Sequence, residues 1–299
     1  AITDLLDNMF QRLQAAEALK ELQPANPAVV VELLAALDNP DDQVKLSCAV
    51  ALWRIEKHAQ ALPAATKMLR AADPQVRALA AVDVGAEFGP DAKPAVPELV
   101  KRLFDPFAAV RSATAEALGR VGPGAADATP ALLAVLGGDE PAFVHAAACE
   151  ALGLIRPAEP DEAVAALKGK LPHPDPLVRV HAALALLRVA GDKSGAKEIE
   201  AGLAGRTHHV RITAAEAAWL LDKNARVVPL LVRSLEEGNL DGTGSDNERY
   251  MAARALGRIG ADAKAAAPEL AKLVTHRDGA VATAARTALK VIDPNAAKA

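Results

Sequence analysis

The sequence contains few of the residues that build catalytic or metal sites. It has only two cysteines in 299 residues, Cys48 and Cys149, and neither has a CxxC partner or a histidine at ligand spacing. Both lie in the middle of expected helices, so we predict two small, buried thiols. No GxSxG motif, P-loop or Cys/His dyad is present. These absences predict a protein that is not an enzyme and that has no metal and no cofactor.

Excess positive charge and long apolar runs are also missing. The formal net charge is −4, whereas a general nucleic-acid binder needs a basic face that displaces counterions from phosphates. No run of about 18 apolar residues occurs, so we expect no membrane span. The N-terminus has no basic segment followed by an apolar one, as a signal peptide would. We expect a cytoplasmic protein. An exported domain that has lost its signal is the alternative, since the chain does not begin with Met.

Aromatic residues are scarce, with two tryptophans, one tyrosine and five phenylalanines. Much of the apolar half of the sequence is alanine, and small residues let helices approach one another closely. This composition favours an all-helical fold.

A valine followed by a basic residue returns at a nearly constant interval. The valines, called here the Val column, are Val44, Val76, Val110, Val144, Val178 and Val210, and successive members are 32 or 34 residues apart. After an inserted loop the same phase resumes at Glu248 and Val281. A fixed period of this length, with two helices in each unit, indicates an α-solenoid.

Three segments that follow the Val column carry a family resemblance. They are Ala-Leu-Gly-Arg-Val-Gly at 117–122, Ala-Leu-Gly-Leu-Ile at 151–155 and Ala-Leu-Gly-Arg-Ile-Gly at 255–260. With them, about residues 25–292 resemble HEAT repeats of the alanine-rich subtype also seen in phycobilisome-lyase subunits. The resemblance implies an all-α fold, a right-handed α-α superhelix of about eight helical hairpins. Residues 1–24 are expected to form an N-terminal capping helix, and residues 25–299 a single continuous solenoid.

Helix start and stop signals agree with this period. Asp-Pro or Glu-Pro pairs precede several second helices, where Asp can cap the helix and Pro fits its first turn. Glycine follows several second helices. The helical pairs expected from these signals span 27–57, 61–88, 95–121, 130–156, 161–190, 194–222, 225–259 and 265–292.

A basic column lies one residue after the Val column and could bind phosphates or acids. We instead predict that it ties neighbouring loops together by pairing with an acidic column at the helix starts, as is typical of HEAT-like arrays. The basic column is Lys45, Arg77, Arg111, His145, Arg179, Arg211 and Arg249. The acidic column is Asp41, Asp73, Asp105, Asp139, Asp175 and Asp246.

The remaining face of the second helices predicts a binding surface. In this architecture second helices line the concave side, and residues two, six and nine positions after the Val column should point into a groove. Among them, Glu116, Glu150 and Glu216 would form an acidic track. The bulky residues expected beside it are Trp53, Leu184, Leu187, Trp219 and Tyr250.

This surface predicts a protein-interaction scaffold that is a monomer and binds a basic or amphipathic protein segment. Aromatic burial would provide affinity and the glutamates orientation. The open alternative is that both tryptophans fill gaps between repeats, while the glutamates pair with Arg120 and other residues four positions away.

Two irregularities interrupt the pattern. Asp83 stands where the other repeats have alanine, so either the helix shifts locally and brings Phe88 inward, or the acid is buried; we favour the shift. The segment 236–246 lengthens one loop. Its oxygen-bearing residues only partly match a calcium loop, because Asp246 and Ala252 replace the required Gly and Glu, and we predict a flexible acidic loop.

Enzymes of similar architecture supply the alternative functions. Deoxyhypusine hydroxylase uses His-Glu pairs as metal ligands, but none of the seven histidines here precedes a glutamate. In HEAT-like alkylpurine glycosylases tryptophans and an acid line a cationic groove; Trp219, Asp222 and Tyr250 could imitate this, although the acidic track would repel DNA. A bilin-lyase-like enzyme and a purely structural domain of a larger protein also stay open.

Overall fold

The computed structural model describes residues 27–223, 226–237 and 246–294, and every regular element among them is helical. The predicted capping helix at 1–24 and most of the predicted 236–246 loop lie outside these residues. The chain divides into two compact units, residues 1–166 and 167–299, which we describe separately. Within the described ranges, no helix is both long and apolar enough to cross a membrane.

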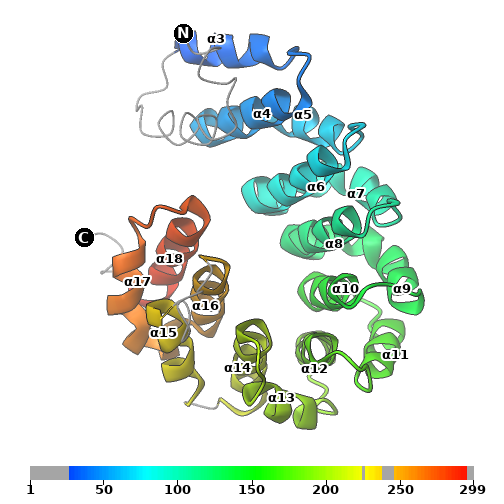
Figure 1. Cartoon of the computed structure of the whole chain (residues 1–299), viewed down its shortest axis with the longest axis vertical. Coiled ribbons are helices and arrows are strands. Elements are labelled where there is room, and N and C mark those ends of the chain that lie inside the picture. The colour runs from blue at the N-terminus through cyan, green and yellow to red at the C-terminus, as the bar shows by residue number, and fades with distance from the viewer. Residues whose placement is uncertain (1–26, 224–225, 238–245, 295–299) are drawn as a thin grey trace. The chain divides into compact units, whose positions relative to one another are not determined.

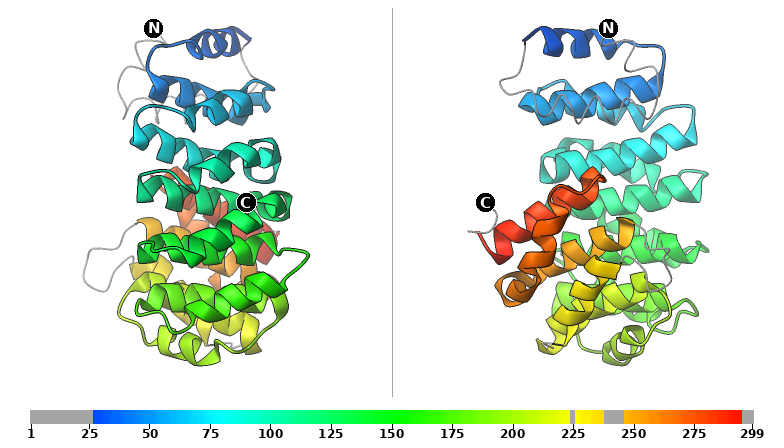
Figure 2. Two further views of the ribbon diagram at one scale, coloured as in Figure 1. Left: turned by 90° about the vertical axis from the view of Figure 1, so that its right-hand side faces the viewer. Right: turned by 60° about the vertical axis from the view of Figure 1, so that its left-hand side comes forward.

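Unit 1 contains helices in two layers. Figures 1 and 2 show the second helices of its repeats side by side in one layer, with the first helices covering them. Its elements are α3 (Pro27–Ala36), α4 (Asp42–Glu56), α5 (Ala61–Met68), α6 (Pro74–Asp83), the π-helix η1 (Val84–Phe88), η2 (Gly89–Ala95), α7 (Val96–Arg102), α8 (Ala108–Val121), η3 (Gly122–Ala128), α9 (Thr129–Gly137), α10 (Ala142–Ile155) and the first part of α11 (Asp161–Lys170).

Unit 2 repeats the arrangement. Within it, α14 contacts both α12 and α16, and α16 contacts α18, so the second helices again form one layer (Figure 1). Its elements after α11 are α12 (Pro176–Ala190), α13 (Ala196–Leu203), α14 (His208–Asp222), α15 (Val227–Glu237), α16 (Asp246–Ile259), η4 (Gly260–Ala266), α17 (Ala267–Leu273) and α18 (Gly279–Ile292).

The predicted start signals position the second helices. The side chains of Asp41, Asp73 and Asp175 accept hydrogen bonds from backbone N–H groups in the first turns of α4, α6 and α12. These bonds satisfy donors that have no intrahelical partner. The Val column is buried throughout, and both cysteines are buried, as predicted.

The glycines nine positions after the Val column set the spacing of the second helices. A Cβ on Gly85 would lie 2.6 Å from the Cα of Ala117, and a Cβ on Gly257 would lie 3.2 Å from the Cα of Ala288. Each glycine therefore faces an alanine seven positions after the column in the next repeat. Residues nine and seven lie on opposite sides of a helix with 3.6 residues per turn, so one contacts the next second helix and the other the previous one.

Substitution of Gly85 by alanine is expected to destabilise the protein by about 1–3 kcal/mol, because the new methyl group meets backbone rather than a flexible side chain. The matched control is Gly169→Ala in α11, where an added Cβ meets nothing within 4 Å, and where alanine should be neutral or slightly stabilising. Thermal unfolding followed by circular dichroism measures both. Equal melting temperatures for the two variants would contradict the close-packing role.

The favoured interpretation of Asp83 is confirmed. α6 ends at Asp83, and the following turn, η1, is a π-helix, which contains more residues per turn than an α-helix. This local shift brings Phe88 into the core, where it is buried.

Candidate functional site

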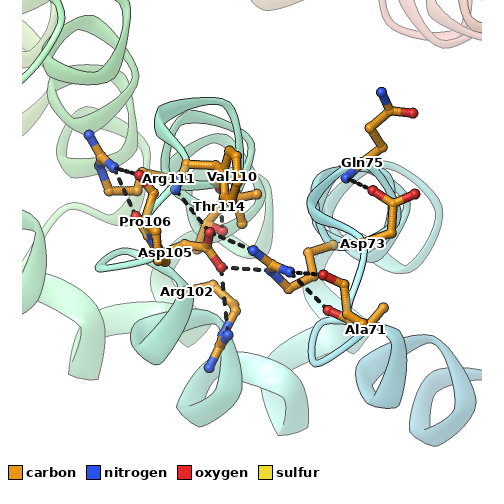
Figure 3. Close-up of polar contacts among 12 residues, drawn as sticks. Ala71, Asp73, Gln75, Arg102, Asp105, Pro106, Val110, Arg111 and Thr114 are labelled. Atoms are coloured by element: carbon orange, nitrogen blue, oxygen red, sulfur yellow. Dashed lines mark hydrogen bonds and ion pairs between the residues drawn. The ribbon is translucent and has the colours of Figure 1, made fainter.

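The basic column forms a structural ladder at the loops between first and second helices. Arg77 donates to both carboxylate oxygens of Asp105 at 2.7 and 2.9 Å, and to the backbone carbonyls of Ala71 and Ala72, both at 2.9 Å. Figure 3 shows these contacts around Asp105 and Ala71. Arg77 thus joins the end of its own first helix to the start of the next second helix.

Three other arginines of the basic column also bind the backbone carbonyls of the preceding loop, and one of them pairs with an acid of the next repeat as well. The guanidinium groups of Arg179 and Arg211 donate to the carbonyls five and six residues earlier. Arg111 does the same and also pairs with Glu140 of the next repeat at 2.5 Å.

The predicted pairing with the acidic column is found for Arg77 with Asp105 and for Arg249 with Asp246. Arg111 pairs with Glu140 instead of Asp139, and Lys45 pairs with Asp42 instead of Asp41.

Electrostatics around Asp105 fit a structural role. Burial would raise the pKa of this carboxyl group. The hydrogen bonds from Arg77 and from the Phe107 backbone N–H, together with the charges of Arg77 and Arg102, outweigh burial and lower the pKa below its ordinary value. The carboxylate is thus held in its charged form and closes a contact between repeats.

In unit 2, the prediction that Trp219, Leu184 and Glu216 are accessible is wrong, because all three are buried. Trp219 is 7% exposed and belongs to the core of α14, α15, α16 and α18, and Leu184 is buried in the same cluster. Trp219 stands nine positions after the Val column, where other repeats have a glycine packed on the next helix, so its indole fills the space between helices. The gap-filling alternative holds for this residue, and its buried ring cannot form the wall of a glycosylase pocket.

Glu216 is also buried, with 5% of its surface exposed. It forms ion pairs with Arg188 on α12 and with Arg258 on α16, the latter at 2.9 Å. The acidic track therefore does not include Glu216, because arginines from the two flanking helices cover and neutralise it. Leu187 and Tyr250 are partly buried against the same core, and the Arg254 guanidinium lies 5.3 Å from the Tyr250 ring centre.

Trp53, in unit 1, is partly exposed but held in place. Its indole N–H donates to the Glu87 carbonyl at 2.9 Å, and its ring centre lies 4.7 Å from that of Phe88. The adjacent Arg54 binds the Glu87 carboxylate. This tryptophan therefore joins the first and second repeats, and the Lys57 Nζ lies over its ring, 5.0 Å from the ring centre.

The remaining predicted residues lie at an accessible surface of unit 1. Glu116 is 44% exposed and pairs with Arg120 at 3.9 Å, and Glu150 is partly exposed. Both stand six positions after the Val column, on α8 and α10, which pack side by side. At the equivalent place on α6, which also contacts α8, Val82 is 39% exposed.

Sequence reasoning missed one apolar residue of this surface, because that residue lies three positions after the Val column and not two, six or nine. Leu79, one turn before Val82 on α6, is 44% exposed, whereas the equivalent residues Ala113 and Ala147 are buried. The sequence did contain a signal for this exposed residue: Leu79 is larger than Ala113 and Ala147, which occupy the same position in the next two repeats. We call Leu79, Val82, Glu116 and Glu150 the unit 1 row.

Within the described residues, no group of three or more His, Cys, Asp or Glu side chains could hold a metal ion. The adjacent residues His208 and His209 do not point to a common metal position either. The Nδ1 atom of His208 lies 3.6 Å from the Oε2 atom of Glu248. The ring of His209 instead contacts the ring of His181 edge-on, with 5.6 Å between the ring centres.

Comparisons with known proteins agree with this architecture. No curated protein matches the sequence. Among solved structures, the complex of CpcE and CpcF of phycocyanin lyase from Nostoc sp. PCC7120 is similar, with a TM-score of 0.50 and 22% identity over 89% of this chain and 94% of that chain. An engineered protein gives a TM-score of 0.47 and 21% identity over 97% of this chain and 87% of that one. The likeness to the lyase complex, at 22% identity, concerns the fold alone.

The family comparison is more specific. The family model for HEAT repeats matches residues 62–153 and 129–218, which together span more than half of the chain. The matched range contains the Arg77–Asp105 pair, Gly85 and the unit 1 row. The chain therefore belongs to the HEAT-repeat family.

Proposed function

We propose that this HEAT-repeat chain is a protein-interaction scaffold without catalysis of its own, and that it binds a basic, amphipathic protein segment on the second helices of unit 1. The observation that carries the proposal is the unit 1 row. In it, two exposed apolar side chains on α6 are followed by accessible carboxylates on α8 and α10, and α8 contacts both α6 and α10.

The two ends of the row differ in chemistry. Leu79 and Val82 offer an apolar contact, which is the usual source of affinity for an amphipathic segment. Glu116 and Glu150 offer negative charge, which sets the orientation of such a segment. The Glu116–Arg120 contact does not prevent this, because an ion pair at 3.9 Å with an exposed carboxylate is weak and exchanges readily.

Helix packing predicts the spacing of the partner's residues. Packed helices lie about 8–10 Å apart, so the carboxylates on α8 and α10 are separated by about that distance. In a helical partner, residues seven positions apart are separated by about 10 Å, at 1.5 Å per residue. A helix lying across the row would therefore place one apolar residue on α6 and basic residues seven and fourteen positions later on α8 and α10.

The test uses a synthetic helical peptide with leucine at one position and lysines seven and fourteen positions later. Binding to the full chain is measured by fluorescence anisotropy. We expect the Glu116→Lys/Glu150→Lys variant to bind at least about tenfold more weakly, which corresponds to about 1.4 kcal/mol. Val82→Asp should weaken binding as well, because it places charge in the apolar contact.

The control variant is Glu32→Lys/Glu162→Lys, which makes the same charge change at exposed positions of the first helices α3 and α11. It should bind the peptide within about twofold of the unmodified protein. Equal losses in both double variants would mean that net charge alone attracts the peptide, and unchanged binding by the Glu116→Lys/Glu150→Lys variant would remove the unit 1 row as the binding surface.

A further inference from the structure

Unit 2 exposes two large apolar side chains, and both have the same place in their repeats. Among the residues that the structure describes in unit 2, the large hydrophobic side chains that are exposed are Leu220 on α14, at 41%, and Val291 on α18, at 53%. Each lies ten positions after the Val column. Arginine has this place in four other repeats, as Arg54, Arg120, Arg188 and Arg258. The two apolar residues therefore depart from the repeat pattern at an accessible position.

The helix between them carries arginine on the same face. α16 contacts both α14 and α18, and the three helices follow one another in the layer of second helices (Figure 1). At the place of Leu220 and Val291, α16 has Arg258, and one turn earlier it has Arg254. Residues four positions apart lie on one face of a helix. The order across the three helices is thus apolar, basic, apolar, and we call these four residues the unit 2 row.

Both arginines of the unit 2 row have accessible surface. The Arg258 side chain is 29% exposed, although it binds Glu216 at 2.9 Å. Arg254 is partly exposed, and its guanidinium lies 5.3 Å from the Tyr250 ring centre. A contact with an aromatic ring positions a guanidinium group without neutralising its charge. The two side chains therefore offer positive charge to a partner.

The face around the row is positive as well. Positions three, six and ten after the Val column lie one turn apart, and on α14, α16 and α18 the one acid at these positions is Glu216. Glu216 is buried and binds both Arg188 and Arg258. The exposed charged residues at the ends of α14 and α18 are Asp222, Lys223 and Lys290. The charge of this face is therefore opposite to that of the unit 1 row.

We propose that the unit 2 row is a second binding surface, which takes an acidic protein segment with apolar residues on both sides of the acid. Leu220 and Val291 cover the apolar residues of the segment, and Arg254 and Arg258 bind the carboxylate between them. A nucleic acid would need a longer run of cations to displace its counterions, whereas this chain has a net charge of −4. The surface needs no binding at the unit 1 row, because it lies on other helices and selects the opposite charge.

Helix packing predicts the spacing of the segment's residues. Packed helices lie about 8–10 Å apart, so Leu220 and Val291, which are two helices apart, are separated by about twice that distance. In a helical segment, residues seven positions apart are separated by about 10 Å. A helix lying across the row would therefore place two apolar residues, fourteen positions apart, on Leu220 and Val291, with the acidic residue midway between them.

The test uses a labelled helical peptide with leucines fourteen positions apart and glutamate midway. Its binding to the full chain is measured by fluorescence anisotropy, beside a peptide in which lysine replaces the glutamate. We expect the glutamate peptide to bind at least about tenfold more tightly, and the difference to fall below about threefold in Arg254→Glu. Val291→Asp should weaken binding of the glutamate peptide at least about fivefold, because it places charge in the apolar contact.

The matched controls make the same changes at other exposed positions. Lys264→Glu on η4 and Val31→Asp on α3 should each bind the glutamate peptide within about twofold of the unmodified protein. Glu116→Lys/Glu150→Lys, which alters the unit 1 row, should also retain the peptide. Thermal unfolding followed by circular dichroism confirms that each variant is folded.

Equal binding of the two peptides by the unmodified protein would overturn the proposal, and so would equal losses in Arg254→Glu and Lys264→Glu. Loss of the glutamate peptide in Glu116→Lys/Glu150→Lys alone would assign the peptide to the unit 1 row and overturn it as well. Binding of a labelled DNA duplex that is abolished in Arg254→Glu would show a nucleic-acid surface in place of one for an acidic segment.

Discussion

Replacing Asp105 with alanine is expected to destabilise unit 1 by about 3–5 kcal/mol, because the substitution leaves a buried guanidinium without its carboxylate. The Asp105 side chain is 1% exposed and that of Arg77 is 10% exposed. Two carbonyl bonds would still hold Arg77, but they do not neutralise its charge. Chemical denaturation of the full chain, followed by circular dichroism, measures the loss.

Asp139→Ala is the matched control for this substitution. Asp139 has the same place in its repeat, five residues before the Val column, but it is exposed, and Glu140 provides the carboxylate for Arg111 instead. A change of less than about 0.5 kcal/mol is expected there. Similar losses in both variants would show that the acidic column acts only through helix capping.

Acid titration gives the same contact a second signature. The pKa of Asp105 is lowered from its ordinary value of 3.8, so its contribution to stability is present above that value. The contribution is lost as the pH falls below it, through the lowered pKa of the folded state. The unmodified protein should therefore lose more stability than Asp105→Asn when the pH falls from about 4 to about 2, and parallel acid profiles would contradict this assignment.

Glu216→Ala is expected to destabilise unit 2 by about 3 kcal/mol, since it removes the carboxylate shared by two arginines. Most of the destabilisation is expected to come from Arg188, because only 4% of its side chain is exposed and its charge would be left buried without a carboxylate. The side chain of Arg258 is 29% exposed and can be solvated by water. Hydrogen exchange of α12 and α14, read peptide by peptide, locates the loss, and the melting temperature measures its size.

The control occupies the same helix position in another repeat. Glu116→Ala removes an exposed carboxylate with an ion pair at 3.9 Å and should cost about 0–0.5 kcal/mol. The double substitution Arg188→Leu/Glu216→Leu should cost less than Glu216→Ala, because removing both charges leaves no buried arginine without a partner. A double variant less stable than the single one would indicate that the charges themselves are needed for packing.

The residues that begin each helix could be recognised in the sequence because their effect is local. An aspartate such as Asp73 caps the turn that follows it, and the next residue, Pro74, fits that turn whatever lies around it. The bonds from Arg179 to carbonyls five and six residues earlier are local as well. The period of the Val column then predicts the order of the helices and the family.

The sequence therefore determined the helices and their pairing, but the tertiary structure decided which partner each basic residue binds and which positions are accessible. Glu116 and Glu216 have the same place in their repeats, yet the first is exposed and the second is buried under arginines from α12 and α16. Exposure at such a position depends on the side chains that the neighbouring repeats bring to it. Trp219 shows the same rule, since a large residue in a glycine column fills the contact with the next helix and is lost as a binding residue.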